Sequence, residues 1–168
     1  MSMQLQPTAL TAENFAAFGQ VIDRQVHSHF LINGGSTERY HQMAQVETGP
    51  ADGRAIISVF RKPLADQFPL TIQMLERHPH GSQAFIPLKG HPFLIVVAPP
   101  GKQPDPQQMR LFISDGSQGV NYAAGVWHHP LIVCVDGDEL LVVDRSGQLA
   151  NCDEYTFAAD QLHWVDQP

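Results

Sequence analysis

The sequence has little of what marks several large classes of protein. It has only two cysteines, too few for a disulfide framework, and its longest apolar run covers residues 93–98. A run of that length cannot span a bilayer. The first residues show neither the basic start nor the apolar segment of a signal peptide. We therefore expect a cytoplasmic protein that does not bind membranes.

Basic residues are also scarce. The chain has 10 Lys and Arg against 17 Asp and Glu, a formal net charge of -7 at pH 7, and its largest basic cluster is the pair Arg61-Lys62. Phosphate contacts need concentrated positive charge, so nucleic acid is not expected as a partner. A small anionic substrate is compatible with this charge only if local cations offset the negative field.

The chain does contain short apolar runs separated by Gly, Pro, Asn and Asp. Their spacing of about a dozen residues indicates an all-β sandwich or barrel and argues against βαβ units. One short N-terminal helix is expected, capped by Thr11 and closed by Gly19. We predict a single catalytic domain over residues 1–168, with a long connection at 25–53 that forms a lid or pocket wall. The predicted strands are 55–60, 70–75, 84–88, 93–98, 109–113, 131–135 and 140–143.

Histidine is frequent, and five of the nine histidines lie in or near two short segments, 76–83 and 125–129. Strand alternation puts the apolar residues Ile72 and Met74 on one face of their strand. Glu76 and His78 continue that face, so we expect both inside the barrel. An ionised carboxylate there is costly unless it is paired or bound to a metal.

Two cations are candidates for binding an anionic substrate. Arg61 follows Ile57 and Val59 on one face of its strand, so alternation predicts that its guanidinium also points inside. It then either lines a pocket or forms a buried ion pair with Glu76. Lys89 is the second candidate, although a lysine at that position is also typical of a solvated turn.

Two segments resemble the metal-binding motifs of the cupin superfamily. The first cupin motif has two ligands one residue apart, then an acidic ligand, then a glycine. The second cupin motif ends in a glycine that is followed three residues later by a histidine ligand. The matching residues are Glu76, His78, Gln83 and Gly90, then Gly125 and His128, with Glu replacing the first histidine and Gln replacing the acid. The resemblance implies a cupin-type double-stranded β-helix, or jelly-roll barrel, with metal ligands Glu76, His78, Gln83 and His128.

A narrower resemblance covers nearly the whole chain, from the expected helix to about residue 157. The segments that resemble the ureidoglycolate lyase family are 38–41, 76–88, 119–131, 143–145 and 151–153. This resemblance implies a homodimeric carbon–nitrogen lyase of allantoin and purine breakdown. Such an enzyme would convert (S)-ureidoglycolate to glyoxylate and urea with a divalent metal. One carboxylate, two imidazoles and an amide oxygen suit Ni²⁺, Mn²⁺, Co²⁺ or Zn²⁺.

The reaction requires a base for the substrate hydroxyl and an acid for the departing nitrogen. Without a metal, His78 or His128 can act as the base, because imidazole titrates near neutral pH. Tyr122 or His129 can donate to the nitrogen, and the sequence does not choose between them. For the substrate carboxylate we expect Arg61, with Lys89 as the alternative.

Two other functions fit the same residues. Glu76, His78 and His128 can also form the two-histidine, one-carboxylate iron site of an oxidoreductase. A non-catalytic protein that binds a small acid is the third possibility.

Overall fold

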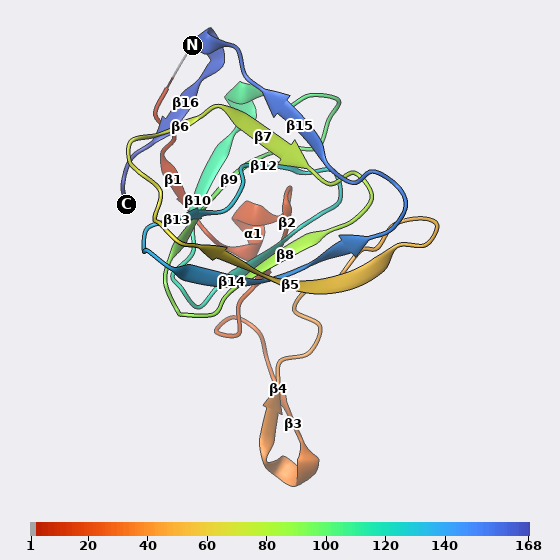
Figure 1. Cartoon of the computed structure of the whole chain (residues 1–168). Helices are drawn as coiled ribbons and strands as arrows, with labels where there is room; N and C mark the ends of the chain where they lie inside the picture. Colours follow the sequence, from red (N-terminus) through yellow and green to blue (C-terminus); the bar gives the residue numbers. More distant parts are fainter. Residues whose placement is uncertain (1–2) are drawn as a thin grey trace.

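The computed structural model of the chain describes residues 3–168. Two sheets enclose a common interior (Figure 1). The larger sheet consists of β1 (Pro7–Ala9), β10 (Arg110–Ile113), β9 (Phe93–Ala98), β12 (Trp127–His128), β7 (Met74–Arg77) and β15 (Asp153–Thr156), with β13 (Ile132–Val133) also paired to β9. The other consists of β2 (Gly19–Ile22), β11 (Gly119–Tyr122), β8 (Gln83–Pro87), β14 (Asp138–Ser146) and β5 (Arg54–Lys62).

The remaining elements are short. Two further strand pairs are β6 (Leu70–Ile72) with β16 (His163–Val165), and β3 (Phe30–Ile32) with β4 (Thr37–Arg39). Thr11 caps helix α1 (Ala12–Phe15), and its hydroxyl accepts a hydrogen bond from the backbone N–H of Asn14. The helix ends at Phe15, so the expectation that Gly19 closes it was wrong; Gly19 begins β2. The 3-10 turns are η1 (Asn33–Gly35), η2 (Pro106–Gln108) and η3 (Ala159–Gln161). The predicted all-β, cupin-type fold with a short N-terminal helix is confirmed.

Strand β9 is buried along its whole length because apolar clusters cover both of its faces. Phe93, Ile95 and Val97 belong to the cluster inside the barrel. Leu94 and Val96 alternate with them and belong to a second cluster, on the other side of the strand. A strand covered on both faces reads as a continuous apolar run.

The predicted strand 70–75 is interrupted at Gln73, between β6 and β7. Ile72 and Leu75 pack in the same cluster outside the barrel although they are three positions apart. Regular alternation would place them on opposite faces, so the prediction that Ile72 shares the face of Glu76 was wrong. The inward–outward alternation of side chains begins anew in β7, where Glu76 faces the interior.

Strand β5 is an edge strand, paired only with β14. Ile57 and Val59 are 74% and 55% exposed, and Arg61 continues this outer face. Phe60, in the opposite phase, contacts the buried ring of Phe85 with centroids 5.8 Å apart. The prediction that Arg61 points into the barrel was therefore wrong.

The predicted long connection at 25–53 contains the β3–β4 hairpin. Figure 1 shows this hairpin as an orange arm that projects away from the barrel. Among residues 3–168, no helix is long and apolar enough to cross a membrane.

Candidate active site inside the barrel

Three potential metal ligands meet where β7 pairs with β12. His128 lies directly opposite Glu76 in this antiparallel pair, and His78 follows β7 by one residue. Oε1 of Glu76 lies 3.6 Å from Nε2 of His128 and 4.0 Å from Nε2 of His78. One ligand atom from each residue lies within 4.8 Å of the others. This separation is suited to ligands that share one ion.

Backbone carbonyls orient both imidazoles. Nδ1 of His128 lies 3.0 Å from the carbonyl of Val126, and Nδ1 of His78 lies 2.6 Å from the carbonyl of Asn151. A carbonyl only accepts hydrogen bonds, so each Nδ1 carries the proton and each Nε2 faces the interior. His128 is 1% exposed, and its Nε2 has no hydrogen-bond partner among the described residues. Metal-binding histidines are typically held in this way, so the donors present fit a divalent ion.

Gln83 brings a fourth donor to the cluster. Its side chain is buried on β8, and its Oε1 lies 3.1 Å from Nε2 of His78. Its amide nitrogen donates to Asp144 Oδ2 at 3.3 Å. The structure therefore brings together all four residues predicted as metal ligands.

The protonation state of His128 also suits metal binding. Burial lowers the pKa of His128. A neutral imidazole is the form in which a histidine binds a metal.

Tyr122 and His129 flank this cluster. The ring of Tyr122 stacks on His128, with centroids 4.4 Å apart and an interplanar angle of 18°. Burial and the Glu76 carboxylate raise the pKa of the Tyr122 phenol, which keeps its proton. Burial lowers the pKa of His129, whose Nδ1 lies 2.8 Å from the carbonyl of Pro130.

A hollow of about 300 Å³ leads from the surface to Glu76. Arg61 borders it, but its side chain is 54% exposed and its Nε lies 3.4 Å from Glu139. The expected Arg61–Glu76 pair is not formed, because the outer phase of β5 directs the guanidinium to Glu139. Lys89 also lies near Glu139 and donates to the carbonyl of Gly137. The residues lining the hollow are Phe60, Arg61, Lys62, Glu76, Phe85, Pro130 and Leu131.

Lys62 is a cation at this hollow that the sequence reasoning missed. It shares the inner phase of Phe60, and its ammonium lies 2.7 Å from Asp66 Oδ1 and 3.4 Å from the carbonyl of Leu131. If the face of β5 that carries Phe60 had been predicted to point inside, Lys62 would have been the predicted cation for the substrate carboxylate. Both faces of β5 carry apolar residues, so the sequence pattern alone could not show which face points inside the barrel.

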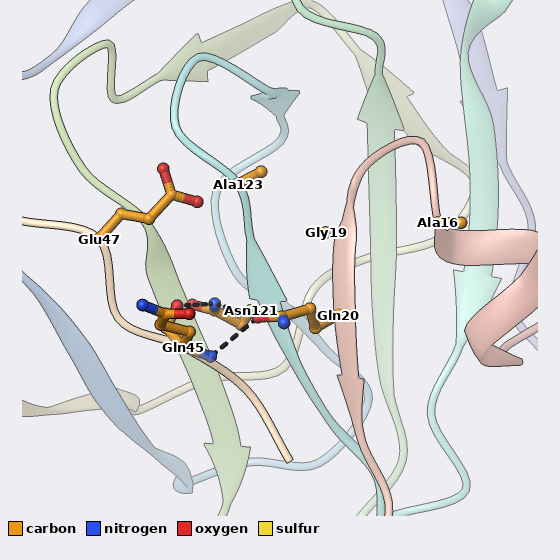
Figure 2. Close-up of a pocket in the computed structure, with 7 residues that line it drawn as sticks. All are labelled: Ala16, Gly19, Gln20, Gln45, Glu47, Asn121 and Ala123. Atoms are coloured by element: carbon orange, nitrogen blue, oxygen red, sulfur yellow. Dashed lines mark hydrogen bonds between the residues drawn. The ribbon is translucent and has the colours of Figure 1, made fainter. Parts of the chain in front are cut away.

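A second hollow, of about 410 Å³, lies on the other side of the five-stranded sheet, against β2 and β11 (Figure 2). There the amide nitrogen of Asn121 donates to Gln20 Oε1 and to the carbonyl of Gln45, at 3.1 and 2.9 Å. These bonds hold the backbone at Gln45 against β2 and β11. The barrel interior is the candidate active site, because imidazole and carboxylate donors converge there, whereas among the residues that the structure describes Glu47 is the one ionisable residue that lines this second hollow and no histidine does.

A cupin-type barrel with carboxylate, imidazole and amide donors in its interior has the architecture of an enzyme that acts on a small molecule. Comparison with known proteins identifies the family: the model described as Ureidoglycolate lyase matches residues 2–164. Proteins named ureidoglycolate lyase from Azotobacter vinelandii and Stutzerimonas stutzeri are 53% and 59% identical to the chain. The alignments cover 99% and 94% of this chain, and 98% and 92% of those proteins. The chain belongs to the ureidoglycolate lyase family, and the predictions of this family and of a lyase are confirmed.

Proposed function

We propose that this protein cleaves (S)-ureidoglycolate into glyoxylate and urea during allantoin breakdown. The observation that carries the proposal is the convergence of Glu76, His78 and His128 behind a small hollow, in a chain of this family. The substrate carbon bears a carboxylate, a hydroxyl and a ureido nitrogen. Cleavage removes the hydroxyl proton, forms the carbonyl of glyoxylate and sends the carbon–nitrogen electrons to nitrogen, which gains a proton to give urea.

Glu76, His78, Gln83 and His128 would hold the divalent ion, for which Ni²⁺, Mn²⁺, Co²⁺ and Zn²⁺ are the candidates. When bound, such an ion lowers the pKa of a hydroxyl and fixes its orientation. The chain contributes the rest of the geometry. The carbonyls of Val126 and Asn151 hold both imidazoles with Nε2 directed inward, available as a ligand or as a base.

Tyr122 is our choice for donation to the leaving nitrogen. A neutral His129 whose Nδ1–H is directed to the Pro130 carbonyl has only an acceptor, Nε2, left to offer. The Tyr122 phenol retains its proton and lies against His128. His129 then acts as a hydrogen-bond acceptor at the edge of the site.

Lys62 is our choice for the substrate carboxylate, in place of Arg61 and Lys89. Its ammonium lies on the inner phase of β5 and borders the hollow that contains Glu76. Arg61 would first have to leave Glu139. Lys62 needs only to share its contact with Asp66.

The test is to incubate the purified protein with each enantiomer of ureidoglycolate and measure urea and glyoxylate. Equal amounts of both products from the (S) form alone support the proposal. Oxygen consumption that requires Fe²⁺ would instead indicate the oxidoreductase, and tight binding without turnover would indicate the small-acid-binding protein. Either result would overturn the lyase assignment for this chain.

We also propose that the protein is a cytoplasmic homodimer. The exposed Ile57 and Val59 on an edge strand, together with Phe30 and Leu31 on the projecting hairpin, form apolar surface that a second copy can cover. Light scattering at micromolar concentration should give twice the 18.6 kDa chain mass. A single-chain mass would refute the dimer.

A further inference from the structure

Asp144 lies inside the barrel next to the proposed metal ligands. It continues the interior-facing phase of Leu140 and Val142 on β14, both fully buried. Its Oδ2 accepts the bond from Gln83, whereas its buried Oδ1 has no hydrogen-bond partner among residues 3–168. Within that range no cation forms a salt bridge with it. Asp144 as a whole is only partly buried, but a carboxylate oxygen that is buried without a partner is costly, so this position calls for a functional explanation.

The contact with Asp144 determines which way the Gln83 amide faces. The two ends of a glutamine amide have nearly the same shape but opposite hydrogen-bonding roles. An ionised carboxylate can only accept, so it selects the rotamer that turns the NH₂ group toward Asp144. The amide oxygen then faces the other way, 3.1 Å from Nε2 of His78. Hard and borderline cations bind an amide through its oxygen, so this is the ligating orientation.

We propose that Asp144 is a positioning residue that holds the Gln83 amide with its oxygen toward the metal ligands. The inference rests on the metal site proposed above. It also explains the glutamine at a position where the cupin motif has an acid. The negative charge is displaced by one side chain, from position 83 to position 144, and stays in the barrel interior.

The experiment compares Ni²⁺ affinity, by calorimetry, in the wild type, Asp144→Ala, Gln83→Glu and the double variant. Asp144→Ala should raise the dissociation constant about 10- to 100-fold, the usual effect of losing a residue that orients a ligand. The Tm of the metal-free protein should not fall. In the double variant the introduced carboxylate has two equivalent oxygens and needs no orienting partner, so affinity should return to within about threefold of wild type. Asp160→Asn, at an exposed site on η3, controls for net charge.

Two results would overturn the proposal: an unchanged dissociation constant in Asp144→Ala, or a double variant that binds no better than Asp144→Ala. A metal-free readout separates this inference from the metal site. Hydrogen exchange of the Gln83 side-chain amide, followed by NMR, should be faster in Asp144→Ala than in the wild type. If neither protein binds Ni²⁺, the metal site fails, and this exchange rate still decides whether Asp144 holds the amide. Equal rates would contradict the positioning role.

Discussion

The barrel interior has an aromatic end, where α1 and the turn after it pack against β10, and a histidine end, where β7 meets β12. At the aromatic end, the ring of Phe112 packs against Phe15 and Phe18 with centroids 5.3 and 5.9 Å apart. At the histidine end, polar atoms face one another, and Nε2 of His128 is buried without a partner among the described residues. The first arrangement stabilises the fold. The second leaves a buried polar atom unpaired within residues 3–168 at a cost in stability, an arrangement that is common at functional sites.

Removing a donor at the histidine end should have the largest effect. His128→Gln should lower kcat/KM by about 10³-fold or more, because a ligand that supports several kcal/mol of transition-state stabilisation is lost. The Tm of the metal-free protein should fall only moderately, because the variant loses the Nδ1 bond to the Val126 carbonyl and the stacking on Tyr122 but no Nε2 hydrogen bond within the described chain. Steady-state kinetics and calorimetric melting measure the two quantities. A collapsed Tm would place His128 among the structural residues.

The matching change at the aromatic end is Phe112→Ala. It should lower the free energy of unfolding by about 3–5 kcal/mol, because it leaves a cavity beside the rings of Phe15 and Phe18. Urea denaturation measures this loss, and Phe112→Leu should lose clearly less. The variant that remains folded should keep kcat/KM within a few-fold of wild type. A fall as large as that of His128→Gln would mean that the two ends are not separable.

The two neighbouring cations of β5 test which phase of the strand faces the substrate. Lys62→Ala should lower kcat/KM about 10- to 150-fold, mainly through KM, as expected for a lost hydrogen bond between charged groups. Arg61→Ala should have a much smaller effect, because that guanidinium is exposed and engaged with Glu139. A larger effect of Arg61→Ala would restore Arg61 as the carboxylate ligand.

The smallest effect concerns acid stability. Burial lowers the pKa of His129 in the folded protein, so the unfolded chain binds a proton at a higher pH than the folded chain does. Stability should therefore fall as the pH drops through the unfolded pKa, by at most about 1.4 kcal/mol per pH unit for this histidine. Melting of the metal-free protein between pH 7 and pH 5 should show the decline. His129→Gln should make it less steep, and the remaining slope is expected from His128, whose pKa burial also lowers. An unchanged slope would show that His129 titrates alike in both states.

The sequence predicts the histidine end and strand β9, but it does not predict which face of strand β5 lies inside the barrel. The spacing of Glu76 and His78, together with the Gly125 motif and His128, is specific enough to predict the cluster. The β9 run also predicts its strand, because a strand covered on both faces needs apolar side chains throughout. Strand β5 could not be assigned in the same way. Its outer face carries Ile57 and Val59, so apolarity did not indicate the interior.

The supporting residues of the site were not predictable from spacing. Asn151 acts through its backbone carbonyl on His78, an interaction that any residue type could supply. Asp144 acts through Gln83 across two paired strands, so its role follows from the register of β14 against β8. Strands β12 and β13, each of two residues, are too short for a periodicity to appear.

The central claim is that the donors at the histidine end hold the ion on which cleavage depends. The most direct measurement is the kcat/KM of chelator-stripped protein on (S)-ureidoglycolate, titrated separately with Ni²⁺, Mn²⁺, Co²⁺ and Zn²⁺. We predict low activity in the stripped wild type, and a rise in proportion to bound ion that saturates at one per chain. We predict no rise in His128→Gln. Stripped wild-type protein that keeps full kcat/KM would contradict the claim and leave the imidazoles themselves as the catalytic groups.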